Sequence, residues 1–285
     1  MTTRRVRTVW SWLPAFRTVA ETQHLPTAAH ELGVVPSSIS RTVKQLEDEL
    51  GVTLFDRTSK TLVLNDAGRR LVVAVREAMR LVDDALGTVI GDELRGAVGA
   101  VATSDIAQVL LTTAAAILAE SSPQLVMASR IARFDDMADM LLRGEVDAAV
   151  MLEAPGHEDL RALELATWTR AVFMRAGPLE PGDHRCVIAG TPTDHVHDGW
   201  PPQHTRSVVA WAPDERSALE LCARSTFATV AFDAVARASG LDARLVRVAE
   251  LEIAPRTLYL VHRRAVGRHA RTDALVDAIQ HAARA

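Results

Sequence analysis

The chain has 285 residues, of which 48% are hydrophobic and 24% charged, and its formal net charge is -4. This is the composition of a globular protein, and the length allows two domains. No stretch approaches the roughly 18 continuous apolar residues of a transmembrane helix, and the N-terminus has no apolar core with a cleavage site, as a signal peptide would. Because the only cysteines are Cys186 and Cys222, a disulfide framework is not indicated. We therefore expect a cytoplasmic protein with no membrane association.

Charge is unevenly distributed along the chain. Residues 1–64 contain eight Lys or Arg and six Asp or Glu, a net charge of +2, which leaves -6 for the remainder. The only two lysines, Lys44 and Lys60, both lie in this N-terminal segment. The negative total therefore does not exclude a nucleic-acid-binding domain at the N-terminus.

Two short helices are predicted first. Residues 12–20 carry apolar side chains at helical spacing, with Leu13 and Phe16 on one stripe. Residues 27–32 form the second helix, where small alanines allow close packing, and Gly33 is a typical residue to end it.

A third helix is predicted from Pro36 to the residue before Gly51. One face is apolar at intervals of four, three and four residues, and the opposite face is polar. Short hydroxyls early in the helix and long cations one turn later suit a helix whose N-terminal half enters a DNA major groove. The alternative is the solvated face of an ordinary amphipathic helix. The apolar residues are Ile39, Val43, Leu46 and Leu50, and the polar residues include Ser37, Ser38, Arg41, Lys44 and Gln45.

Two short β-prone runs follow Gly51 around a polar tip at residues 57–60. This pattern predicts a wing, a β-hairpin whose two cations reach a phosphate backbone or a minor groove. The candidate DNA-binding residues of the helix and the wing together are Ser37, Ser38, Ser40, Arg41, Lys44, Arg57 and Lys60.

A series of short motifs runs through this region in a fixed order: Ala28-Ala29, Pro36-Ser37, Ile39-Ser40, Leu46-Glu47, Leu50-Gly51, Leu54-Phe55, Arg57 and Ala67-Gly68. Each motif is weak alone. As an ordered set they make the run from about residue 13 to residue 71 resemble the DNA-binding domain of LysR-type transcriptional regulators. Two positions depart from the family pattern. Val35 stands where Ser or Thr usually caps the recognition helix, a loss of about 1 kcal/mol, and His24-Leu25-Pro26 replaces the commoner Ser-Phe-Thr.

A long helix is predicted from its N-cap Asn65 to about Ile90. Its apolar residues alternate at intervals of four and three, the heptad spacing of a coiled coil. The alternative is a helix packed on its own domain. In LysR-type regulators the equivalent helix pairs two chains antiparallel, so the resemblance implies a homodimer or a homotetramer. The apolar residues of the heptad are Leu71, Val75, Ala78, Val82, Ala85 and Val89.

Beyond residue 91, short apolar runs alternate with helical patterns, which indicates an α/β domain. This part resembles the two-lobed effector domain of the same family, which is similar to periplasmic binding proteins. The expected fold class is therefore a multi-domain α+β protein. Its parts are a winged helix-turn-helix (1–64), a linker helix (65–91) and an effector-binding domain (92–285), with lobe one at about 92–165 and 256–285 and lobe two at about 166–255.

Open α/β sheets bind ligands beyond the carboxyl ends of their strands. Hydroxyls and amides that follow the first strand, at a helix N-terminus, favour an anion, although Asp105 would repel a carboxylate unless it is paired. The alternative is that these residues are ordinary caps and loop residues. A family Gly-x-Gly turn is replaced here by Ser225-Thr226-Phe227, which suggests a differently shaped loop. The candidate effector-binding residues are Thr103, Ser104, Asp105, Arg133, Phe134, Trp211, Ser225 and Thr226.

Other kinds of site remain open. Histidines and aspartates near residues 183–204 could bind a metal ion; they are Asp183, His184, His195, His197, Asp198 and His204. The two cysteines could form a redox switch, although buried inert thiols are the simpler interpretation. No motif of a hydrolase, a phosphate-binding loop or a metalloprotease is present. A small-molecule-binding or enzymatic α/β protein, or a regulator that no longer senses a ligand, is a further alternative.

The sequence thus predicts a transcription regulator that binds promoter DNA and responds to a small molecule in the cleft between two lobes. No catalytic residue, cofactor or resident metal is expected. The expected partners are double-stranded DNA, an unidentified effector, further copies of this chain and, for such a regulator, RNA polymerase.

Overall fold

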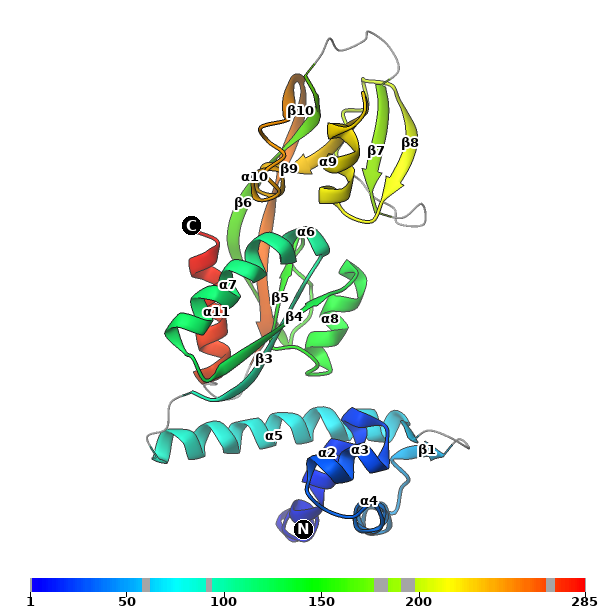
Figure 1. Cartoon of the computed structure of the whole chain (residues 1–285). Helices are drawn as coiled ribbons and strands as arrows, with labels where there is room; N and C mark the ends of the chain where they lie inside the picture. Colours follow the sequence, from blue (N-terminus) through cyan, green and yellow to red (C-terminus); the bar gives the residue numbers. More distant parts are fainter. Residues whose placement is uncertain are drawn as a thin grey trace. The chain divides into compact units, whose positions relative to one another are not determined.

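The computed structural model describes residues 2–57, 62–90, 94–176, 184–190, 198–264 and 270–284. The chain forms two compact units (Figure 1). Unit 1 comprises residues 1–92 and 142–144, and unit 2 comprises residues 93–141 and 145–285. None of the described helices is long and apolar enough to cross a membrane.

Unit 1 is a group of short helices followed by a two-stranded hairpin and one long helix. The hairpin strands are antiparallel, with Phe55 opposite Leu64 and Arg57 opposite Leu62, so the predicted wing forms. The elements are α1 (Thr2–Val9), the 3-10 helix η1 (Trp10–Trp12), α2 (Leu13–Thr22), α3 (Leu25–Glu31), α4 (Pro36–Leu50), β1 (Phe55–Arg57), β2 (Leu62–Leu64) and α5 (Asp66–Ile90).

The predicted third helix is confirmed as α4, with Pro36 in its first turn and Gly51 after its end. Gly51 has a φ of 69°, a left-handed conformation that costs glycine little. Two details of unit 1 differ from the prediction. The second helix begins at Leu25, because Pro26 fits its first turn. The helix α1 was not predicted, since its eight residues are too polar to show an apolar stripe.

An apolar core holds unit 1 together. Phe16, Ile39 and Leu46 are almost fully buried there. The Phe16 ring meets the Phe55 ring edge to face, with 5.7 Å between centroids, so α2 packs directly on the first wing strand.

The long helix α5 belongs to this core only along its first half. Asn65 is its N-cap, as predicted, because its Oδ1 accepts a hydrogen bond from the Gly68 amide at 2.9 Å. Val72 and Val75 are buried in the unit 1 core. Further along the helix, Val82, Leu86 and Val89 are 42%, 56% and 82% exposed.

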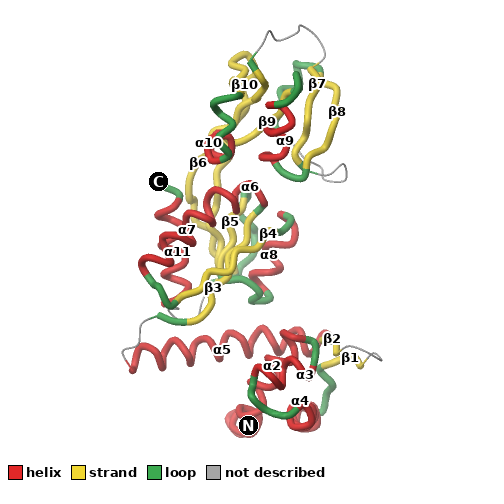
Figure 2. Tube along the Cα trace, viewed as in Figure 1, coloured by secondary structure: helices red, strands yellow, loops and turns green. Residues whose placement is uncertain are grey.

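Unit 2 is built on one sheet of eight strands in the order β4-β3-β5-β10-β6-β9-β7-β8, with helices packed on it (Figure 2). Its elements are β3 (Gly96–Ala102), α6 (Ser104–Ile106), the π-helix η2 (Ala107–Leu111), α7 (Thr112–Ser121), β4 (Leu125–Ile131), α8 (Phe134–Leu142), β5 (Ala148–Met151), β6 (Leu160–Arg175), β7 (His184–Ala189), β8 (Arg206–Ala212), α9 (Glu215–Ala223), β9 (Ala228–Phe232), α10 (Asp233–Ala238), β10 (Leu245–Arg263) and α11 (Ala270–Ala282).

The sheet is continuous through two lobes because β6 and β10, of 16 and 19 residues, pair antiparallel through both of them. The predicted crossing points, Ala166 and Arg256, fall inside these two strands. In lobe one, a core of residues from β3, β5, β10 and the helices η2, α7 and α11 is buried. In lobe two, separate apolar cores lie on the two faces of the sheet.

Candidate DNA-binding and effector sites

The two faces of α4 differ as the sequence predicted. Ile39, Val43 and Leu46 are buried in the unit 1 core. The side chains on the outer face are exposed, and they include all five of the predicted DNA-reading residues of this helix: Ser37, Ser38, Ser40, Arg41 and Lys44. An exposed row of hydroxyls and cations on a rigid helix can reach base edges in a major groove.

A partly buried contact that the sequence analysis did not identify fixes α4 relative to the wing. The Glu47 Oε1 accepts hydrogen bonds from the Leu54 amide at 2.7 Å and the Phe55 amide at 3.4 Å. The carboxylate thus orients the start of the hairpin. Arg57 is the last residue of β1, and Lys60, at the predicted wing tip, lies outside the described residues.

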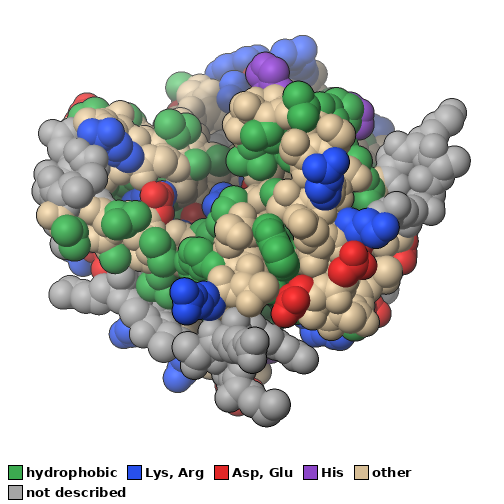
Figure 3. Space-filling model, turned by 90° about the horizontal axis from the view of Figure 1, so that it is seen from below, with side chains coloured by type: hydrophobic (Ala, Val, Ile, Leu, Met, Phe, Trp, Pro, Cys, Tyr) green, Lys and Arg blue, Asp and Glu red, His purple; other side chains and the backbone are tan. Residues whose placement is uncertain are grey.

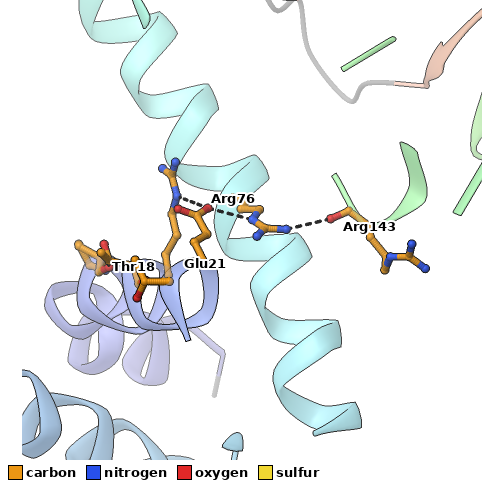
Figure 4. A network of polar contacts seen from close by, with 7 residues as sticks. Thr18, Glu21, Arg76 and Arg143 are labelled. Carbon is orange, nitrogen blue, oxygen red and sulfur yellow. Dashed lines mark hydrogen bonds and ion pairs between the residues drawn. The ribbon is translucent and has the colours of Figure 1, made fainter. Parts of the chain in front are cut away.

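A second polar contact joins α2 to α5. The Glu21 Oε1 accepts from Arg17 Nε and from Arg76 Nε, each at 3.0 Å (Figure 4). Because Arg76 lies on α5, this shared carboxylate helps to hold the long helix against the helix-turn-helix.

In unit 2, a hydrogen bond connects the two lobes at the carboxyl end of β3. Asp105 lies in α6, directly after this strand, and its Oδ1 accepts from the Glu215 amide at 2.8 Å. Glu215 is the first residue of α9, so the carboxylate of lobe one meets a helix N-terminus of lobe two. Apolar contact accompanies it, since Val109 of η2 packs against the core of lobe two.

Ionisable side chains are buried around this interlobe hydrogen bond. The Glu215 side chain is buried, and its Oε2 accepts from the Phe232 amide at 2.8 Å. The Arg170 Cζ lies 5.1 Å from the centroid of the Phe232 ring. The Arg170 Nε is buried and has no hydrogen-bond partner in the described part of the chain. A donor that is buried and unsatisfied is costly, which makes it a candidate for ligand contact.

Burial changes the acidity of these groups. Desolvation raises the pKa of Asp105 to about 6, with a smaller contribution from the Asp214 carboxylate. Desolvation and then the Asp105 charge raise the pKa of Glu215 to about 8, which keeps Glu215 mostly protonated at neutral pH. Burial lowers the pKa of Arg170. Perturbed groups that gather where two lobes meet are typical of a binding site.

The structure brings some of the predicted effector residues together. Thr103 and Ser104 lie beside Asp105 at the start of α6. Because β3 and β4 are parallel neighbours, Arg133 and Phe134, which follow β4, lie at the same edge of the sheet. Arg133 is exposed and Phe134 half-buried.

The predicted residues of lobe two lie at two different ends of α9. Trp211 is 39% exposed near the end of β8, just before α9. Ser225 and Thr226 follow the opposite end of α9 from Glu215, and the Ser225 hydroxyl donates to the Leu221 carbonyl at 2.8 Å. These two residues precede β9, so they lie at the amino end of that strand and not at the carboxyl end, where the sequence rule expects a ligand. We do not include them in the effector site.

The lobe-two residues that contact the Asp105 region were missed by the sequence analysis. Glu215 and Arg170 carried no motif. The carboxyl-end rule could have found Glu215, because it follows β8 just as Asp105 follows β3.

The described part of the histidine-rich segment makes contacts within lobe two. The Trp200 Nε1 donates to the His204 carbonyl at 2.8 Å, and Asp198 forms an ion pair with Arg206. Among the described residues, no group of three or more His, Cys, Asp or Glu is placed to hold a metal ion. Asp183, His195 and His197 lie outside the described residues.

Both cysteines are buried, and they do not form a disulfide in this structure. They belong to different apolar cores, on opposite faces of the lobe-two sheet, which disfavours a disulfide between them. Burial raises the pKa of the Cys222 thiol to about 12. Because the thiolate is the form that reacts with oxidants, this environment disfavours a redox role for Cys222.

A winged helix-turn-helix followed by a two-lobed α/β domain is the architecture of a one-component bacterial regulator. The family model described as "Bacterial regulatory helix-turn-helix protein, lysR family" matches residues 10–69, and the "LysR substrate binding domain" model matches residues 91–284. The second match covers more than half of the chain. The chain therefore belongs to the LysR family, which confirms the resemblance and the fold class predicted from the sequence.

Individual relatives agree with this assignment. Over 141 residues, 49% of this chain and 75% of the relative, the chain is 33% identical to a probable hydrogen peroxide-inducible genes activator of Mycobacterium xenopi. It is 28% identical over 159 residues to the HTH-type transcriptional regulator DgdR of Burkholderia cepacia, 55% of this chain and 54% of that protein. The solved structure of ArgP from Mycobacterium tuberculosis matches with a TM-score of 0.74 and 18% identity, over 95% of this chain and 96% of that one. That likeness shows a shared fold.

Proposed function

We propose that this protein is a transcription regulator that binds promoter DNA through α4 and the wing and responds to a small-molecule effector. The observation that carries the proposal is the exposed hydroxyl and cation row of α4 on a helix fixed by its buried opposite face, within a domain of the LysR family. The relatives with regulatory names support it. We propose no catalytic activity and no cofactor.

In this proposal, base edges are read by α4 and the phosphate backbone is held from the wing. Arg41 is the proposed main reader, because an arginine can bind guanine through two hydrogen bonds. The other proposed base-reading residues are Ser37, Ser38, Ser40 and Lys44, and the wing contacts are Arg57 and Lys60.

The effector site is proposed at the interlobe contact around Asp105. Lobe one contributes the start of α6, and lobe two contributes Arg170 and Glu215. An effector that enters here must replace or retain the Asp105–Glu215 hydrogen bond. Replacing the bond would change the lobe geometry and so shift the population of DNA-binding conformations, whereas retaining it would hold the lobes as they are. Thr103, Ser104, Arg133, Phe134 and Trp211 remain predicted contacts.

We further propose that the working form is a homodimer or homotetramer. The support is the exposed apolar stripe of Val82, Leu86 and Val89 along the second half of α5. A second copy of α5 would cover it at heptad spacing. Two linked DNA-binding domains would also occupy two half-sites at once. RNA polymerase is a further proposed partner.

The name of the Mycobacterium xenopi relative raises a peroxide response as a second candidate function. The cysteines of this chain argue against thiol chemistry for that purpose, because both are buried and the pKa of Cys222 is raised to about 12. We therefore propose a non-covalent effector.

Arg41→Ala tests the DNA-reading role. Loss of a bidentate base contact should cost about 1 to 3 kcal/mol of binding free energy and relax specificity at one base pair. The measurement is a titration of the purified chain against its own upstream intergenic DNA and against unrelated DNA over a salt series. Specific wild-type binding that weakens steeply with salt supports the proposal.

The control is Arg161→Ala, which removes an exposed arginine of β6 in unit 2 and should leave both DNA titrations unchanged. Equal weakening by Arg41→Ala on every DNA sequence would make Arg41 a phosphate contact. A wild-type chain without any salt-sensitive DNA binding would refute the proposed function.

A further inference from the structure

The helix α1 lies outside the segment that matches the family's helix-turn-helix model. That match begins at residue 10, whereas α1 spans Thr2–Val9. Three of its eight residues are arginines, and no acidic residue occurs before Glu21. The arginines are Arg4, Arg5 and Arg7. The extra helix is therefore strongly basic.

This helix is attached to the DNA-reading part of unit 1. Val9, its last residue, is buried in the same core as Ile39 and Val43 of α4. The chain continues directly into η1, which contacts α4. Figure 1 draws α1 and α4 together at the lower end of unit 1. The arginines of α1 are thus carried on a helix anchored next to the proposed reading helix.

The exposure of α1 fits a polar partner. Among the residues of α1 whose side chains the structure describes, Val6 is 50% exposed, Arg7 is exposed and only Val9 is buried. A surface helix that serves only solubility mixes charges of both signs. A helix with one sign only, beside a DNA-reading helix, has the chemistry to bind a polyanion. Figure 3, seen from below Figure 1, shows single Lys and Arg side chains among hydrophobic and uncharged ones.

We propose that α1 is a second DNA-contacting element, which binds the phosphate backbone beside the site read by α4. The partner is double-stranded DNA, recognised by charge and not by sequence. N-terminal arms that add contacts to a helix-turn-helix work on the same physical basis. This inference rests on the proposed function and extends it to a segment outside the matched domain.

The test is the triple variant Arg4→Ala, Arg5→Ala and Arg7→Ala in the full chain. Alanine is the best helix former, so the substitutions preserve the helix. Each lost phosphate contact makes the slope of log affinity against log salt less steep by about 0.9, or by about 2.7 for three contacts. The affinity difference from wild type should then shrink by about 40-fold between 50 and 200 mM salt. The loss should be equal on the upstream DNA and on unrelated competitor DNA.

Two matched variants make the result interpretable. The triple variant Arg161→Ala, Arg237→Ala and Arg244→Ala removes three exposed arginines from unit 2 and should leave the salt slope unchanged, which excludes an effect of net charge. Replacing the three α1 arginines by lysines keeps the charges and should retain the slope, because phosphate contact needs a charge and not the arginine fork.

Three results would overturn the inference: an unchanged salt slope in the alanine variant, a loss confined to the upstream DNA, or a lysine variant as weak as the alanine one. If the wild-type chain shows no salt-sensitive binding, the proposed function itself fails, and this inference fails with it.

Discussion

At the scale of single residues, Gly68 shows how closely the start of α5 approaches the wing. A Cβ at this position would lie 2.1 Å from the Leu54 carbonyl oxygen and 2.7 Å from Leu64 Cδ2. The nearer atom belongs to the backbone, which cannot rotate away as a side chain can. We expect Gly68→Ala to reduce the free energy of unfolding of unit 1 by about 1 to 3 kcal/mol, the usual cost of overpacking. Thermal unfolding of the purified chain measures this.

The control for this prediction is Gly156→Ala. Gly156 has no heavy atom within 4 Å of its ideal Cβ position, so its substitution should not lower the unfolding temperature. Equal unfolding temperatures for wild type and Gly68→Ala would show that the start of α5 and the wing do not pack as the structure has them.

At the scale of secondary-structure elements, α4 begins without a side-chain cap. Val35 has the extended backbone of an N-cap, with φ -83° and ψ 145°, but its side chain accepts no hydrogen bond. A serine there can accept from the amides of the first turn. We predict that Val35→Ser stabilises unit 1 by about 1 kcal/mol. Chemical denaturation followed by the helical circular dichroism signal measures the change.

Val34→Ser is the matched control, because Val34 is also exposed but precedes the cap position. It should stabilise the unit by much less than Val35→Ser. If the two variants behave alike, the gain comes from lower surface hydrophobicity and not from capping. DNA specificity should stay unchanged in both, since neither valine is among the proposed reading residues.

At the scale of the whole molecule, the interlobe contact makes the stability of unit 2 depend on pH. Burial raises the pKa of Glu215 from 4.5 to about 8 and that of Asp105 from 3.8 to about 6. The folded state therefore binds more protons than the unfolded state between these values, so stability falls as pH rises from about 4 to about 8. We predict a lower unfolding temperature at pH 8.5 than at pH 5.5.

Glu215→Gln should reduce this pH dependence, because an amide cannot ionise but can still accept from the Phe232 amide. The variant should be more stable than wild type at pH 8.5. Glu220→Gln, on the same helix and paired with Arg224 near the surface, is the control and should keep the wild-type profile. A wild-type profile for Glu215→Gln would mean that the Glu215 carboxyl is not buried as the structure has it.

Local patterns were enough to predict the DNA-binding side of this protein. The helix from Pro36 to Leu50, its buried and exposed faces and the Asn65 cap follow from residues close in sequence, because helical periodicity and capping are local effects. The ordered motifs were specific enough to predict the family. The helix α1 escaped prediction because a short polar segment has no periodic pattern, and its anchoring depends on one buried residue, Val9.

The effector side shows the limit of such reasoning. Asp105 was predicted from its place after a strand, but its partner Glu215 is 110 residues away in sequence. Ser225 and Thr226 were predicted from the same rule on strand ends, and the fold places them at the other end of α9 from Glu215.

The sequence by itself thus determined the family, the helix-turn-helix and the side chains that α4 exposes. Only the tertiary structure decided which charged groups meet between the lobes, because the long strands β6 and β10 set the spacing of segments far apart in the chain. The burial that raises the pKa of Asp105 and Glu215 likewise exists only once those segments pack together.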